Sequence, residues 1–129
     1  MRSFVVGLAL LALATPAATQ RKQKPPDVQV VETKARRGEG RILMDGRVRV
    51  TAEKPIRGLV VIFDFLSPEN VVLVSENAVL EDRPIASGEE RAFHSETTEP
   101  PRAVRYQVRA FDRGEKELRV ANRGPFPIE

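Results

Sequence analysis

Hydrophobic and polar residues alternate with a period of two along much of this chain, and this pattern constrains the fold more than any other feature. In RILMDGRVRVT, residues 41–51, the even positions carry small or apolar residues and the odd positions mostly carry charge. AVRYQVRAF, residues 103–111, repeats the alternation with two arginines on its polar side. Because successive side chains of a strand point to opposite faces, both segments are predicted to be β-strands with one buried face.

The segment LVVIFDF, residues 59–65, is apolar on both parities apart from Asp64. Such a strand is best placed at the centre of a sheet, where neighbouring side chains cover both of its faces. SPEN, residues 67–70, then predicts a turn, because proline presets the backbone of an early turn position.

Shorter strands are predicted between turn-forming residues that recur about every ten positions. They span residues 28–33, 71–75, 78–81, 91–95 and 115–121. Seven or eight short strands in series, with no helical pattern between them, predict an all-β fold. We expect an antiparallel β-sandwich of two sheets.

The middle of the chain carries a characteristic order of positions: a G-x-V strand opening, a polar turn, an apolar strand rich in phenylalanine, and a Gly-Glu turn before another phenylalanine. These positions are Gly46 and Val48, residues 53–56, residues 63–67, and residues 87–89 with Phe93. Over about residues 40–95 they resemble the bacterial FxLYD domain. The resemblance implies an immunoglobulin-like sandwich of an exported protein and says little about function.

An immunoglobulin-like arrangement also suggests a partner for the lone acid of the apolar strand. Residues 56–66 would form the third strand, which lies beside the sixth, at residues 104–110. Asp64 would then pair across the strands with Arg105 or Arg109, whose aliphatic stems would cover the apolar neighbours.

The same arrangement assigns the aromatic residues to the interior. Phe63 and Phe65 would lie in the core between the sheets. Tyr106, near the start of the sixth strand, would resemble a tyrosine corner, with its ring buried and its hydroxyl bonded to the backbone.

The N-terminus has the three-part pattern of a secretory signal peptide, predicted to span residues 1–18. As a helix, its apolar run at residues 4–14 would rise about 16 Å, short of the ~30 Å hydrocarbon core of a bilayer. Arg21, Lys22 and Lys24 follow the run directly, and flanking positive charge tends to stay on the cytoplasmic side. An uncleaved N-terminal membrane anchor is therefore the alternative.

The expected organisation after the signal peptide is a single domain. A basic, proline-containing linker at residues 19–26 precedes the sandwich at residues 27–122, and an extended, proline-rich tail occupies residues 123–129. Removal of the signal peptide would leave a periplasmic or secreted bacterial protein. The chain has no cysteine, so its core must stabilise it without disulfides.

No residue set supports catalysis or a cofactor. The absence of cysteine and the single histidine, His94, exclude thiolate sites and multi-histidine zinc sites. His94 falls on the exposed parity of its strand, which is poor support for a catalytic triad. The acidic pairs in SGEERAF and RGEKEL lie in apparent turns, where carboxylates stay hydrated. We therefore predict a non-enzymatic protein with no cofactor and no metal.

The chain is slightly basic, with 21 lysines and arginines against 18 acids, which is weak evidence for an anionic partner. Arg105 and Arg109 are the candidates for such a contact. Neighbouring acids, such as Glu90 on one sheet and Glu117 on the other, offer the alternative of neutralised solvent faces. Nucleic acid is not expected, since no exposed aromatic platform accompanies the basic residues.

The C-terminal sequence NRGPFPIE offers a second candidate contact. Two prolines enforce an extended backbone around Phe126 and Ile128, which could dock on a partner groove or sheet edge. The alternative is that this tail packs on its own domain.

These observations predict an exported interaction module of the bacterial envelope. Its partner, an unknown envelope protein or an anionic envelope component, would contact edge strands or the tail. A second hypothesis is a carrier or binder of an anionic small molecule, lipid or glycan, which requires a concave pocket.

Overall fold

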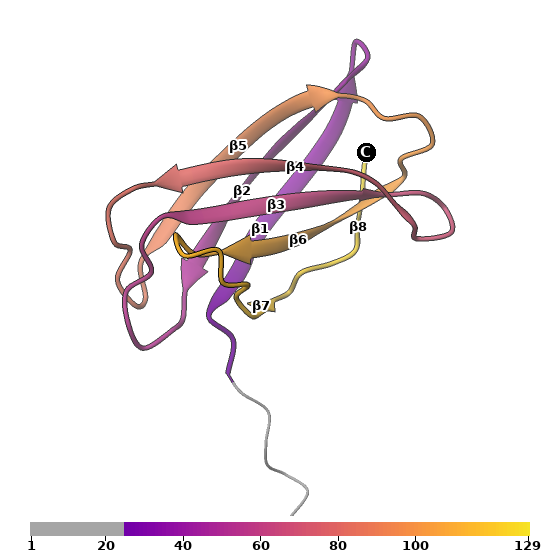
Figure 1. Ribbon diagram of the computed structural model, residues 1–129. Helices are drawn as coiled ribbons and strands as arrows, with labels where there is room; N and C mark the ends of the chain where they lie inside the picture. The colour runs from indigo at the N-terminus through magenta and orange to yellow at the C-terminus, as the bar shows by residue number, and fades with distance from the viewer. Residues whose placement is uncertain (1–24) are drawn as a thin grey trace, which may run out of the picture.

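The computed structural model describes residues 25–129, which form two four-stranded β-sheets packed face to face (Figure 1). One sheet has the order β5-β2-β1-β7 and the other β4-β3-β6-β8. The first consists of β1 (Val28–Gly38), β2 (Arg41–Val50), β5 (Glu90–Thr98) and β7 (Val120–Ala121). The second consists of β3 (Leu59–Leu66), β4 (Val72–Glu81), β6 (Arg105–Phe111) and β8 (Phe126–Pro127). The predicted all-β sandwich is confirmed.

The pairing of strands departs from the expected antiparallel pattern at one place. β1 and β7 run parallel, with Val28 opposite Val120, whereas the other paired strands of the described residues are antiparallel. The chain leaves β6 in the second sheet and crosses to the first before it forms β7. This crossover brings β7 alongside β1 in the same direction, which a two-residue hairpin could not do.

Several strand boundaries differ from the prediction: β1 and β5 are longer than residues 28–33 and 91–95, and two further segments differ in kind. The strands predicted at residues 71–75 and 78–81 are one strand, β4, because Glu76 and Asn77 continue the pairing with β3. The strand predicted at residues 115–121 is reduced to Val120 and Ala121. Before it, the Asp112 carboxylate accepts a hydrogen bond from the Lys116 backbone N–H at 3.0 Å, which favours a turn.

The inner faces of the two sheets meet in one hydrophobic core. Phe63 and Phe65 of β3 are fully buried, as predicted, and the Phe63 ring lies 5.3 Å from that of Phe93. Each large side chain of this kind contributes about 1.5–3 kcal/mol to stability when fully buried. The largest fully buried side chains are Tyr106, Phe63, Phe65, Ile42, Met44, Leu59 and Ile85.

Tyr106 is buried as expected, but its hydroxyl does not bond to the backbone. It lies 2.8 Å from the hydroxyl of Thr33 on β1, so this hydrogen bond joins the two sheets. Burial raises the pKa of Tyr106, and the bond to Thr33 opposes that rise only in part. The tyrosine-corner prediction is therefore correct for the ring and wrong for the hydroxyl.

Tyr106→Phe tests the contribution of this inter-sheet bond. We expect the substitution to lower the unfolding free energy by about 1 kcal/mol, because the ring still fills the core and only one hydrogen bond is lost. Denaturant unfolding of Tyr106→Phe, Thr33→Val and the double variant measures the effect. Fully additive losses in that cycle would show that the two hydroxyls do not interact.

The C-terminal tail is part of the sandwich. β8 pairs with β6, and the Phe126 ring packs 5.4 Å from the ring of Tyr106. Ile128 is only 7% exposed and belongs to the core. The Glu129 backbone N–H then donates to the Ala35 carbonyl of β1 at 2.9 Å, so the tail connects the second sheet to the first.

The prediction that Phe126 and Ile128 are exposed anchors for a partner is therefore corrected. Ile128 is buried in the core, and Phe126 is partly buried against the Tyr106 ring, on the strand that pairs with β6. The sandwich also extends beyond residue 122, the expected boundary, to the end of the chain. The alternative, a tail packed on its own domain, describes the structure.

The predicted signal peptide at residues 1–18 and most of the predicted linker at residues 19–26 lie outside the described residues. At the start of the described part, the Thr51 hydroxyl donates to the Pro26 carbonyl at 2.9 Å. Within residues 25–129 no helix is long and apolar enough to cross a membrane.

Candidate functional site

A buried carboxylate lies on the outer face of the second sheet, between β4 and β6. Asp64 is 2% exposed and stands opposite Ser75 on β4 and Gln107 on β6. The Arg109 guanidinium donates to both carboxylate oxygens, at 2.7 and 3.1 Å. Ser75 and Gln107 donate to it at 2.6 and 3.0 Å. The predicted pairing of Asp64 with an arginine of the sixth strand is confirmed, with Arg109 as the partner.

This hydrogen-bonded set keeps Asp64 ionised. Burial is the largest single influence and raises the pKa of Asp64, but the bonds from Arg109, Ser75 and Gln107 together outweigh it and hold the pKa below its ordinary value. The bond to Asp64 in turn raises the pKa of Arg109. A carboxylate held in this way is a structural anion, because acid–base chemistry at neutral pH needs a pKa near 7.

The basic side chains of the two sheet faces are largely engaged by partners within the domain. Arg105 donates to the Asn70 side chain at 3.1 Å and to the Pro68 carbonyl at 2.9 Å. On the first sheet, the Glu90 carboxylate lies 3.4 Å from Arg47 and 2.5 Å from Arg49. Arg105 and Arg109 therefore share one sheet face but both guanidiniums are engaged within the domain.

The described residues contain no arrangement typical of a metal or acid–base centre. No group of three or more His, Cys, Asp or Glu side chains within residues 25–129 is placed to hold a metal ion. The His94 side chain is 61% exposed, and its Nδ1 lies 2.6 Å from the Asp45 carboxylate. This exposed pair lies across β5 and β2 and has no shielded cleft around it.

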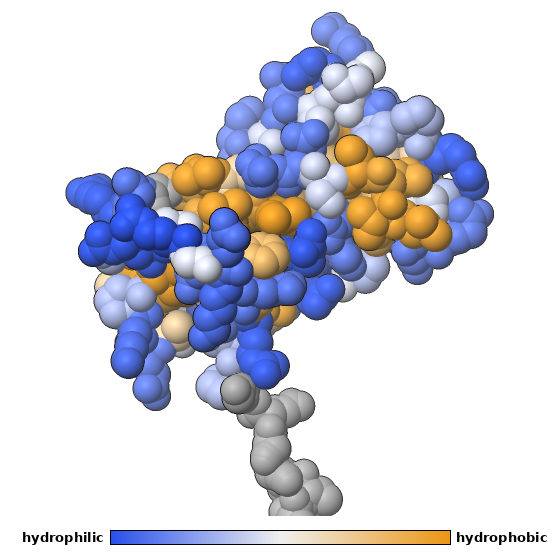
Figure 2. Space-filling model, in the orientation of Figure 1, coloured by the Kyte–Doolittle hydropathy of each residue, from blue (hydrophilic) through white to orange (hydrophobic). Residues whose placement is uncertain are grey.

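Val71, just before the edge strand β4, and the first residues of that strand expose a run of apolar side chains that the sequence prediction missed. Exposed fractions are 57% for Val71, 49% for Val72, 39% for Leu73 and 37% for Val74, and Val79 further along reaches 67%. Figure 2 shows apolar surface gathered at the end of the sandwich where the β3–β4 hairpin projects. Because consecutive residues point to opposite faces, this end of β4 is apolar on both sides.

The other long edge strand, β5, is built differently. It carries Glu90, Arg91, His94 and Glu96, and charged side chains on an edge discourage pairing with another strand. Val71 and the first three residues of β4, Val72 to Val74, carry no charge, whereas Glu76 lies further along the strand. Beyond β3, β4 has no other strand as a neighbour in its sheet, so its outer backbone groups are free to accept one.

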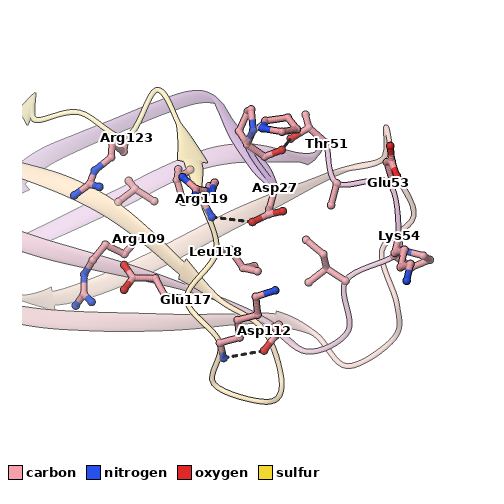
Figure 3. A pocket seen from close by; sticks show the side chains of 18 residues that line it. Asp27, Thr51, Glu53, Lys54, Arg109, Asp112, Glu117, Leu118, Arg119 and Arg123 are labelled. Carbon is pink, nitrogen blue, oxygen red and sulfur yellow. Dashed lines mark hydrogen bonds between the residues drawn. The ribbon is translucent and has the colours of Figure 1, made fainter. Parts of the chain in front are cut away.

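A second feature missed by the sequence prediction is an open pocket of about 930 Å³ at one end of the sandwich (Figure 3). It lies where the approach to β1, the loop after β2 and the segment between β6 and β8 meet. Arg109 lines this pocket, and Arg105 does not. The other basic side chains of the lining are Lys54, Lys116, Arg119 and Arg123.

Comparison with known proteins places the chain by its fold alone. No family model and no curated protein matches it in sequence. A solved structure described as the C-terminal domain of Wzt is similar, with a TM-score of 0.55 at 9% identity over 81% of this chain and 75% of that chain. The Pseudomonas fluorescens alkylpurine DNA glycosylase AlkC, bound to DNA containing an abasic site analogue, gives a TM-score of only 0.38 at 17% identity. That match covers 74% of this chain and 31% of that one. The first similarity supports the β-fold, and the second is too weak to support any argument.

Proposed function

We propose that this protein is an exported, non-enzymatic interaction module of the bacterial envelope that binds a protein partner through β4. The observation that supports this function is the uncharged, apolar edge formed by residues 71–74. Export rests on the signal-peptide pattern of residues 1–18, and the FxLYD-like order of core and turn positions fits an exported sandwich.

The geometry of β4 favours recognition by strand addition. An extended segment of a partner can hydrogen-bond to the free edge, and its side chains can then contact the apolar residues on both faces of the strand. The backbone bonds supply affinity, whereas the alternating side chains supply specificity. An exposed, uncharged apolar edge segment is otherwise an aggregation hazard, so a bound partner also explains why the apolar start of β4 is tolerated.

Site-specific photocrosslinking in the native envelope tests this function. A benzoylphenylalanine at position 73, in β4, is expected to form a covalent adduct with one distinct protein. The same residue at position 92, on the charged edge strand β5, is the matched control and should give none. Val74→Lys, combined with the crosslinker at position 73, should reduce the adduct strongly because it places a charge on the edge.

Three outcomes would contradict the proposed function. They are the absence of any adduct at position 73, equal crosslinking at positions 73 and 92, and an adduct between two copies of this chain. The last would show that β4 is a self-association edge.

A further inference from the structure

The pocket at the end of the sandwich combines charged side chains with an apolar floor. Leu118 and Ile56 are buried to 8% and 6% exposure beneath it, and Pro26 and Pro55 stand at its rim. Figure 3 shows Leu118 in the middle of the lining, with Arg119 and Arg123 on one side and Lys54 on the other. A volume of about 930 Å³ is within the range of small-molecule sites.

Two of the four carboxylates in the lining are already committed to the backbone. Asp27 accepts a hydrogen bond from the Arg119 backbone N–H at 2.9 Å. Asp112 accepts one from the Lys116 backbone N–H at 3.0 Å. Both acids therefore serve to shape the walls of the pocket. Arg109, the fifth cation of the lining, is likewise committed to Asp64.

Over the whole lining five cations stand against four carboxylates, since a hydrogen bond from the backbone does not neutralise an acid. Apart from the groups named above, the lining carries four cations, Lys54, Lys116, Arg119 and Arg123, and two carboxylates, Glu53 and Glu117. The negative charge of Glu117 also raises the pKa of Arg109. Within the part of the chain that the structure describes, neither the Arg119 nor the Arg123 guanidinium has an ion-pair or hydrogen-bond partner. Arginines on the sheet faces, by contrast, are mostly paired with neighbouring acids.

The backbones of the two unpaired arginines are nevertheless held firmly. The Arg119 carbonyl accepts bonds from the Asp27 and Val28 backbone N–H groups, at 2.9 and 3.1 Å. The Arg123 carbonyl accepts a bond from the Val108 N–H of β6 at 2.9 Å. Fixed attachment points reduce the entropy that is lost when a ligand orders the side chains.

We propose that this pocket binds a small amphiphilic oxyanion, a carboxylate or phosphate carried on an apolar chain. Arg119 and Arg123 contact the oxyanion, since the planar guanidinium fork matches both groups. The apolar chain lies over Leu118 toward the prolines of the rim. The mixed charges of the lining disfavour a large polyanion, because Glu53 and Glu117 would repel it. This site lies in a different part of the domain from β4 and does not depend on the proposed function.

Binding of dodecyl phosphate below its micellar concentration tests the proposal. Isothermal titration calorimetry of the purified protein should show saturable binding of dodecyl phosphate and of laurate. Inorganic phosphate, which lacks the chain, and dodecyltrimethylammonium, which has the opposite charge, should bind much more weakly. Comparable binding of either control probe would overturn the assignment.

Arginine variants locate the site. Arg119→Gln and Arg123→Gln should each weaken dodecyl phosphate binding by about tenfold, because each removes a charge-assisted contact. Arg36→Gln is the matched control, since Arg36 is also exposed but lies on β1 outside this pocket, and its affinity should be unchanged. Unchanged melting temperatures would show that all three variants are folded. Equal affinities of all the variants would overturn the proposal.

Vesicles containing phosphatidylglycerol distinguish the source of the oxyanion. Arg123-dependent binding to vesicles as well as to monomeric dodecyl phosphate would support the site and identify a lipid headgroup. Binding to the monomeric probe alone would support it and identify a soluble ligand.

Discussion

Gly46→Ala is expected to lower the unfolding free energy by about 3 kcal/mol, a large fraction of the stability of a domain of this size. A β-carbon at position 46 would lie 2.3 Å from the Phe93 ring and 2.4 Å from the Glu32 carbonyl oxygen. Phe93 is the cross-strand neighbour of Gly46 on β5, and its ring fills the space that a side chain would occupy. The carbonyl belongs to the backbone at an irregularity in the pairing of β1 with β2, so it cannot move without disturbing the first sheet.

Chemical denaturation of the alanine variant measures this cost, and Gly38→Ala is the matched control. Nothing lies within 4 Å of a β-carbon at position 38, so that variant should be neutral or slightly more stable. Adding Phe93→Leu to Gly46→Ala should relieve part of the clash. The double variant should therefore lose less unfolding free energy than the sum of the losses of the two single variants. A Gly46→Ala protein as stable as Gly38→Ala would contradict the close packing at this position.

The sequence predicted the layered fold because the relevant signals are local. In β2 and β6 the alternation of apolar and polar residues shows which face is buried, and in β3 both faces are apolar. These signals can be read without knowledge of the pairing partners. The partner of Asp64 was also narrowed to Arg105 or Arg109 once β3 was placed beside β6, and the structure selects Arg109. The sequence showed Gly46 only as part of the FxLYD-like pattern. The side chain that requires a glycine there, Phe93, lies 47 positions away on another strand.

The features that the sequence did not predict depend on tertiary placement. Whether Phe126 and Ile128 meet a partner or their own domain depends on the open edge of β6, which the tail sequence does not describe. The hydroxyl of Tyr106 meets Thr33, 73 positions earlier in the chain, on the opposite sheet. The pocket with Arg119 and Arg123 exists only because three separate segments meet at one end of the sandwich.

The exposure of the apolar residues of β4 could not be predicted from the sequence for a related reason. An apolar run such as VVLV predicts a buried strand, since burial is the usual fate of such residues. In the structure β4 takes the outer position of its sheet, and its apolar residues remain exposed. Position in the sheet, rather than composition, therefore makes this strand the candidate contact.

Arg109→Met is expected to cost about 3 kcal/mol at pH 7, because it leaves the buried Asp64 carboxylate without its counter-ion. This cost is at the low end for a buried pair, since 30% of the Arg109 side chain is exposed, against 3% of the Asp64 side chain. Methionine preserves most of the aliphatic packing, so the loss reports mainly on charge. Arg105→Met is the matched control on the same strand and face. Its partners are an exposed amide and a turn carbonyl, so it should cost no more than about 1 kcal/mol.

The pH dependence separates charge from packing in this experiment. In the natural protein the pKa of Asp64 is lowered by folding, so its contribution to stability is present at neutral pH and is lost as the pH falls below about 4. Without Arg109, burial dominates and should raise the pKa of Asp64 above its unfolded value of about 3.9. The variant then loses stability as the pH rises through this raised pKa, and the two unfolding free energies should converge between pH 7 and pH 3. Adding Asp64→Asn to Arg109→Met should restore part of the stability at pH 7 and remove this convergence. A difference between the natural protein and Arg109→Met that stays constant across this range would show that Asp64 is not held as a buried anion.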